Sequence, residues 1–152
     1  MKKGQKIEIE IPNSAEYISM ARQTVEQVGK RLGFSTDEQE DISIAVGEAC
    51  TNAVKHGKSP TGECYVQIMC EVIEEGLSVE ITNNVVDFSM PSLTTEPDTN
   101  KSSGYGLFIM SSVMDELNMT RRNGSVTVKM TKKMKMPGAS ENLLPKPTEP
   151  PL

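Results

Sequence analysis

The chain has 152 residues, a net charge of −5 at pH 7 and a pI of about 5.0. This length allows one domain with a hydrophobic core, and the acidic balance argues against direct nucleic-acid binding, because phosphate contacts usually need a basic patch. No apolar run approaches the length of a membrane span, the N-terminus lacks a signal-peptide pattern, and the three cysteines lack Cys-x-x-Cys spacing, so we expect a cytoplasmic protein with reduced thiols.

The first elements in chain order are a strand and two helices. Residues 6–11 (KIEIEI) alternate charged and apolar side chains, which predicts a half-buried strand. Apolar residues at helical spacing follow Ser14, and Gly33 closes that helix. Ser35 then begins Ser-Thr-Asp-Glu, a capping box in which Glu38 reaches back, and this signal opens a second helix that runs to Gly57.

A hairpin and a long polar segment come next. Residues 64–72 (CYVQIMCEV) and 77–82 (LSVEIT) are predicted to be paired strands around a Glu-Glu-Gly turn. Residues 83–104 are polar and have little periodicity. A loop of this length in a compact domain is often a functional lid.

The last elements are a helix and a second hairpin. Helical spacing returns over residues 105–117, and Arg122-Asn123-Gly124-Ser125 predicts a turn into a strand over 126–132. We expect the lysines in and after this strand to mark a solvated edge: Lys129, Lys132, Lys133 and Lys135. From Pro137 the sequence is polar and rich in proline, so we predict a domain over 1–136 and a disordered tail over 137–152.

This order of elements predicts an α/β two-layer sandwich. Strands joined by hairpins favour a mixed, mostly antiparallel sheet. Clean alternation in two of the strands predicts that one sheet face is solvated, so the three helices should cover the other face.

The stretch GEACTNAVKHG in the second helix carries a first set of chemical groups. Glu48 and Asn52 are spaced at i, i+4 and share a face, and Lys55 follows close to the same stripe. A carboxylate can take a proton from a nucleophile, and an amide oxygen is a suitable ligand for Mg²⁺. Phosphoryl transfer needs such parts held in line. The alternative is a polar helix face that merely meets water.

A second set of groups opens the third helix, in the stretch Ser102-Ser103-Gly104-Tyr105-Gly106-Leu107. Backbone N–H groups at the start of a helix bind anions, and glycines let a phosphate approach closely. A simple flexible connection is the alternative for this stretch alone. Two sites with matched chemistry, joined by a segment of lid length, favour a nucleotide site.

Both stretches resemble motifs of one family. GEACTNAVKHG resembles the N-box of the histidine-kinase-like ATPases, whose fold is the Bergerat fold. SSGYGLFIMSSVMDEL resembles the glycine box and the following helix of one branch, the bacterial anti-sigma factors that are also serine-protein kinases. The resemblance covers residues 6–133.

The resemblance implies a function and a set of site residues. Proteins of this branch bind Mg-ATP, hold a sigma factor inactive and phosphorylate a serine on an anti-anti-sigma protein of the STAS fold; the unphosphorylated antagonist captures the kinase and frees the sigma factor. They commonly dimerise, so a homodimer is also implied. Glu48 matches the general base and Asn52 the Mg²⁺ ligand. The residues implied to bind the nucleotide are Asn52, Lys55, Asn83, Ser103, Gly104, Tyr105, Gly106 and Leu107.

One motif departs from the family pattern. The family usually has Asp-x-Gly-x-Gly after the third strand, and its Asp accepts a hydrogen bond from the adenine amino group. Here the aligned stretch is Asn83-Asn84-Val85-Val86-Asp87. Val126 falls near an expected threonine of the adenine pocket, and the adjacent Thr127 is the alternative for that position. Asn83 either presents its oxygen and keeps adenine at reduced affinity, or turns its NH₂ toward the base and relaxes selection toward guanine.

Three hypotheses for the function follow. Glu48 favours a serine-protein kinase that is also an anti-sigma factor, since binding alone needs no base. The altered adenine motif favours a partner-switch protein of the same fold that binds without turning over ATP. A plain interaction domain without nucleotide would leave both motifs as coincidence.

Overall fold

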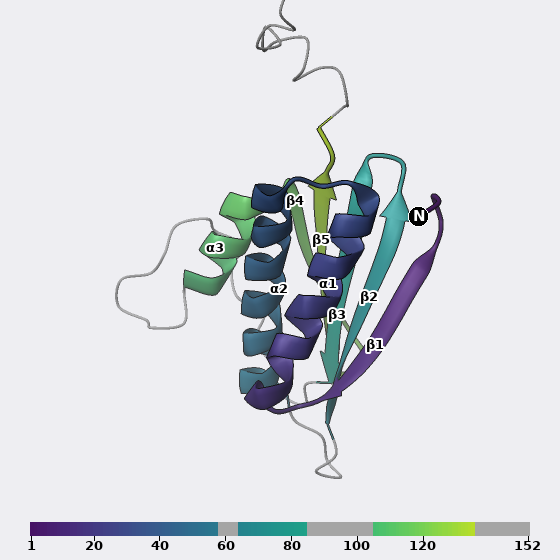
Figure 1. Ribbon diagram of the computed structural model, residues 1–152. Coiled ribbons are helices and arrows are strands. Elements are labelled where there is room, and N and C mark those ends of the chain that lie inside the picture. Colours follow the sequence, from purple (N-terminus) through teal and green to yellow (C-terminus); the bar gives the residue numbers. More distant parts are fainter. Residues whose placement is uncertain (58–63, 85–104, 136–152) are drawn as a thin grey trace, which may run out of the picture.

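The computed structural model describes residues 1–57, 64–84 and 105–135 as one layer of helices on one sheet (Figure 1). Most of the predicted lid and the predicted tail lie outside the described residues. The elements in chain order are β1 (Lys6–Pro12), the short 3-10 helix η1 (Ala15–Tyr17), α1 (Ile18–Leu32), α2 (Thr36–His56), β2 (Tyr65–Ile73), β3 (Gly76–Asn84), α3 (Tyr105–Val113), β4 (Glu116–Arg122) and β5 (Ser125–Lys133).

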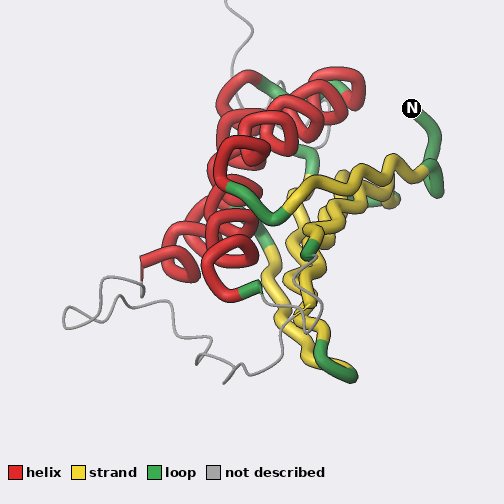
Figure 2. Tube along the Cα trace, turned by 90° about the horizontal axis from the view of Figure 1, so that it is seen from below, coloured by secondary structure: helices red, strands yellow, loops and turns green. Residues whose placement is uncertain are grey.

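The five strands form one sheet in the order β1-β2-β3-β5-β4. Every neighbouring pair of these described strands is antiparallel, so the sheet has no parallel pair where a mixed sheet was predicted. Figure 2 shows the helices gathered on one side of the sheet. The predicted two-layer sandwich with three covering helices is therefore confirmed.

Alternation along the strands builds the core. Val66, Ile68 and Cys70 of β2 are buried against the helices, while the residues between them are half-buried or exposed. A strand turns successive side chains to opposite faces, so one face of each strand enters the core. On α1 and α2 the matching residues include Val25 and Ile42, both fully buried.

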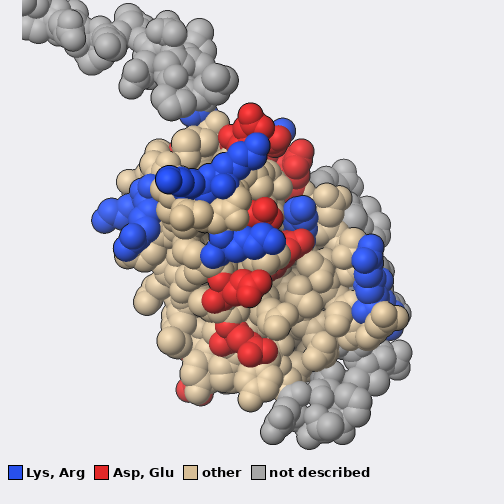
Figure 3. Space-filling model, turned by 90° about the vertical axis from the view of Figure 1, so that its right-hand side faces the viewer, with Lys and Arg blue, Asp and Glu red and all other residues tan. Residues whose placement is uncertain are grey.

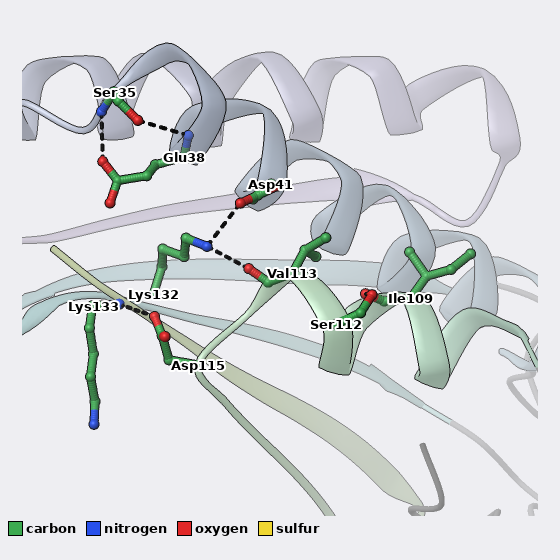
Figure 4. Close-up of polar contacts among 9 residues, drawn as sticks. All are labelled: Ser35, Glu38, Asp41, Ile109, Ser112, Val113, Asp115, Lys132 and Lys133. Carbon is green, nitrogen blue, oxygen red and sulfur yellow. Dashed lines mark hydrogen bonds and ion pairs between the residues drawn. The ribbon is translucent and has the colours of Figure 1, made fainter. Parts of the chain in front are cut away.

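The start of α2 is fixed by the predicted capping box. Ser35 Oγ accepts a hydrogen bond from the backbone N–H of Glu38 at 3.1 Å, and Glu38 Oε1 accepts one from the backbone N–H of Ser35 at 2.9 Å (Figure 4). Such a cap stabilises a helix by about 1 kcal/mol. Gly33, at φ 94°, ends α1 in the left-handed conformation that favours glycine and lets α2 fold back on α1.

The edge strand β1 carries charge on its outer face. Lys6, Glu8 and Glu10 are exposed, whereas Ile7, Ile9 and Ile11 turn toward the helices. Figure 3 views the molecule from the β1 side and shows a band of acidic side chains flanked by basic ones. Charged edge strands resist pairing with other chains. Among the described residues, no helix has the length and apolar character needed to cross a membrane.

The boundary between α3 and β4 differs from the prediction of a helix over 105–117. The helix ends at Val113 and β4 begins at Glu116. Leu117 and Met119 both point toward the helix layer and pair with Met130 and Val128, so a period of two replaces the helical period there. The following turn is as predicted, with Asn123 and Gly124 at φ 47° and 80°.

Candidate functional site

The two motifs meet where α3 packs on α2. Glu48 and Asn52 lie one turn apart on α2 and are partly exposed, while Gly106 lies buried in the first turn of α3. A Cβ placed on Gly106 would lie 3.0 Å from Asn52 Nδ2 and 3.4 Å from Glu48 Oε2. The start of α3 therefore packs closely against the carboxylate and the amide of the N-box, and a side chain at position 106 would press on Asn52.

The small residues of α2 explain how this helix can present polar groups beside the core. Ala49 and Ala53 are buried next to Glu48 and Asn52, which leaves the polar side chains at the margin of the core. A carboxylate and an amide in such a margin keep some solvation and avoid the cost of full burial. Both polar side chains thus remain partly accessible to solvent.

The last turn of α2 carries two basic residues, Lys55 and His56. Lys55 is exposed and follows Asn52 by three positions, so it lies close to the same stripe of the helix. Burial, and then the positive charge of Lys55, hold the pKa of His56 below its ordinary value. The imidazole is therefore mostly neutral at pH 7, and Lys55 is the cation of this turn.

Asn83 lies at the end of β3 with its side chain turned under α2. The residue is 6% exposed, and its Nδ2 donates a hydrogen bond to the carbonyl oxygen of Ala53 at 3.2 Å. The sequence did not point to this backbone partner, although the alternation of β3 places Asn83 on the helix-covered face. One of the two N–H groups of the amide is thereby engaged with α2, and Oδ1 is able to accept a hydrogen bond from a ligand.

The register of β5 decides which residue stands beside Asn83. Val126 pairs with Asn83 and is buried on the helix-covered face. Thr127 points to the opposite face, where its Oγ1 lies 2.9 Å from Thr82 Oγ1. Val126 therefore stands directly beside Asn83, and the surface next to Asn83 is apolar there.

The remaining predicted nucleotide residues fall into two groups. Ser103 and Gly104 lie outside the described residues. Tyr105 is 44% exposed at the start of α3, whereas Leu107 is buried in the hydrophobic core. Tyr105 therefore faces solvent near the site, and any contact of Leu107 with a ligand would have to come from its backbone.

Within the described residues, no group of three or more His, Cys, Asp or Glu side chains is arranged to hold a metal ion. Mg²⁺ bound to a nucleotide needs fewer protein ligands, because it keeps several waters and takes phosphate oxygens. A single protein ligand, the amide oxygen of Asn52, fits that requirement. The backbone of α3 comes close to this amide at Gly106, where a Cβ would lie 3.5 Å from Asn52 Oδ1.

Comparisons with known proteins agree with this geometry. The family model of the histidine-kinase-like ATPase domain matches residues 11–132. The serine-protein kinases RsbW of Bacillus mycoides (strain KBAB4) and Bacillus cereus (strain G9842) are each 37% identical over 142 residues, which is 87% of this chain and 87% of theirs. The chain therefore belongs to the histidine-kinase-like ATPase family, within which it is similar to the RsbW serine-protein kinases. The predicted enzyme class, a serine-protein kinase, is confirmed by these relatives.

Solved structures show the same fold at low sequence identity. The RsbU and RsbW domains of a Mycobacterium tuberculosis protein superpose with a TM-score of 0.63 at 16% identity, covering 88% of this chain and 33% of that one. The histidine kinase domain of a blue-light activated kinase from Erythrobacter litoralis gives a TM-score of 0.52 at 20% identity, covering 88% and 65%. At these identities the likeness concerns the fold alone.

Proposed function

We propose that this chain is an anti-sigma factor that uses Mg-ATP to phosphorylate a serine of a STAS-fold antagonist, and that phosphorylation decides which partner it holds. The observation that carries the proposal is the contact of Gly106 with both Glu48 and Asn52. It brings a carboxylate, an amide and the start of a helix to one place, and the proposal gives them the roles of base, metal ligand and phosphate binder. The RsbW relatives support the kinase class. A sigma factor is the second partner, and the cytoplasm is the compartment where both partners are found.

The residues of α2 and the start of α3 have different roles in the proposed reaction. Glu48 accepts the proton of the antagonist's serine hydroxyl, which makes that oxygen a better nucleophile. Asn52 holds Mg²⁺, which neutralises charge on the nucleotide phosphates when it is bound. The backbone N–H groups at the start of α3, from Tyr105 onward, and the preceding Ser103 and Gly104 bind phosphate oxygens. Lys55 adds positive charge on the exposed surface one turn from Asn52.

The proposed reaction is tested by calorimetric titration with Mg-ATP, Mg-ADP and Mg-GTP, followed by a transfer assay with a purified STAS-domain protein from the same genome. We expect ATP and ADP to bind and phosphate to appear on a serine of the STAS protein. Nucleotide binding without any transfer would instead favour the second candidate function, a binding-only partner switch. The observation that favours this second candidate is Asn83, which supplies no charge to the adenine edge.

Asn83 is proposed to read the adenine amino group with its Oδ1. Asn83→Asp should strengthen ATP binding by about 1 kcal/mol, the difference between a charge-assisted and a neutral hydrogen bond. The same change should lower the midpoint of thermal unfolding of the nucleotide-free protein, because a carboxylate would face the carbonyl oxygen of Ala53 where Nδ2 now donates. Calorimetry with ATP and GTP and a thermal melt measure the two effects. If Asn83→Asp binds ATP no better than the parent, Asn83 does not lie at the adenine edge.

Two buried helical glycines offer a matched pair of substitutions. In Gly106→Ala the new methyl group would press on Asn52 Nδ2, so the amide must move and Mg-ATP affinity should fall on the order of 10-fold, as expected when a ligand is misplaced. In Gly29→Ala the nearest atom, Gln39 Cγ, lies 3.5 Å away, an ordinary contact. This control should keep the affinity and raise the free energy of unfolding by about 0.5–1 kcal/mol. Equal Mg-ATP affinity in the two variants would contradict the role of Gly106.

A further inference from the structure

A partly buried lysine from β5 holds the C-terminal end of α3. Lys132 Nζ donates to the carbonyl oxygen of Val113, the last residue of α3, at 2.6 Å, and pairs with Asp41 Oδ2 on α2 at 3.0 Å (Figure 4). Its side chain is 12% exposed. The prediction of a solvated edge is wrong for this lysine, because the register pairs Lys132 with Leu77 on the helix-covered face.

The chemistry of this position suits a cation. The last carbonyl groups of a helix lack intrahelical partners and carry the negative end of the helix dipole. Lys132 satisfies one of them at Val113 and is neutralised by Asp41, whose side chain is 36% exposed. One ammonium group thus joins an acceptor on α3 to an acceptor on α2. Removing it would leave both acceptors without this donor.

A second set of bonds fixes the same end of α3 to the sheet. The backbone N–H of Asp115 donates to the carbonyl oxygen of Thr131 at 2.9 Å. Asp115 Oδ2 accepts from the backbone N–H of Lys133 at 2.6 Å (Figure 4). The segment after α3 is therefore tied to β5 directly beside Lys132. The helix cannot slide at this end without breaking bonds to both layers.

The two ends of α3 are linked to two points along α2, one directly at Gly106 and the other through Lys132 at Val113. Asp41 precedes Glu48 by seven residues, or about 10 Å along the helix axis at a rise of 1.5 Å per residue. Gly106 precedes Val113 by the same number of residues. The helices thus run antiparallel, with Gly106 at Glu48 and Asn52 and with Val113 at Asp41. A displacement of the Val113 end would be transmitted to Gly106 by a rigid helix of little more than two turns.

We infer that Lys132 is a positioning residue for the nucleotide site: by holding the end of α3 to Asp41, it fixes Gly106 at the distance from Glu48 and Asn52 that Mg-ATP requires. This inference rests on the proposed function. Lys132 touches neither the nucleotide nor the reacting serine. It acts through the placement of α3: the Gly106 end lies close to α2, and the Val113 end is joined to α2 through Lys132 itself.

The test combines amide hydrogen exchange of the nucleotide-free protein with calorimetry of Mg-ATP. In Lys132→Met, the ratio of the exchange rate of the α3 amides to that of the α1 amides should rise on the order of 10-fold. The Kd for Mg-ATP should rise by a similar factor, which is within the range expected for residues that act on a site from outside it. Lys132→Arg keeps the positive charge and enough N–H donors to bind both acceptors. Its exchange ratio and its Kd for Mg-ATP should therefore lie closer to those of the parent.

A control separates positioning from general loss of stability. Val25→Ala in α1 removes fully buried atoms far from α3, and at a temperature where it remains folded it should leave the Kd for Mg-ATP unchanged. An unchanged exchange ratio in Lys132→Met would overturn the tie to α3, whether or not nucleotide binds. A raised ratio with an unchanged Kd, or an equal loss of affinity in Val25→Ala, would overturn the positioning role. A parent protein that binds no Mg-ATP would overturn the proposed function itself and this role with it, while the exchange ratio would still report on the tie.

Discussion

Glu48→Gln should slow phosphoryl transfer to the STAS protein by about 10²–10⁴-fold, the usual contribution of a general base. The amide keeps the shape of the side chain next to Gly106 but cannot accept the serine proton. Mg-ATP should still bind, because in our account Asn52 and the start of α3 hold the nucleotide. Single-turnover transfer assays and calorimetry on the same preparation separate the two effects.

The matched control for this change is Glu40→Gln. Glu40 is on the same helix but exposed, so the same loss of charge should leave transfer at the parent rate. If Glu48→Gln transfers phosphate as fast as Glu40→Gln does, Glu48 is not the base, and its place beside Gly106 would need another explanation.

Asn52→Ala should remove the dependence of ATP affinity on Mg²⁺. The parent should bind ATP much more tightly with Mg²⁺ than with EDTA, whereas the variant should show the weak affinity in both conditions. The domain should remain folded, because Asn52 is partly exposed at the margin of the core. Calorimetry in the two buffers and a thermal melt make this measurement.

Asn118→Ala is the control for the loss of an amide. Asn118 is exposed on β4 and points to the sheet face away from the helices, so its removal should leave the Mg²⁺ dependence intact. A parent protein that binds ATP equally with and without Mg²⁺ would show that Asn52 has no metal to hold.

Signals read over a few residues predicted the fold well. The capping box at Ser35 and the turn at Asn123 and Gly124 depend on neighbours in the sequence, and both are present as predicted. The end of α3 was misplaced, because Leu117 fits both a helical period and a strand period. Only pairing with Met130 of the distant strand β5 decides between them.

Contacts between distant segments limit what the sequence can say about the site. The two motifs were recognised separately, and the structure adds that Gly106 lies against Glu48 and Asn52. The bond from Asn83 to Ala53 involves a backbone carbonyl that no residue type can reveal. Lys132 looked like a surface lysine because its type is polar. Its partners, Asp41 and Val113, are defined only once β5 has its register.

The central claim is that Mg-ATP binds where α3 meets α2, and amide chemical-shift mapping tests it most directly. On titration of the ¹⁵N-labelled parent with Mg-ATP, we expect saturable shifts at the amides around Glu48, Asn52 and Gly106 and at Asn83. The exposed outer face of β1, around Glu8, should show none. Absence of shifts at saturating Mg-ATP, or shifts that cluster away from the α2–α3 contact, would contradict the account.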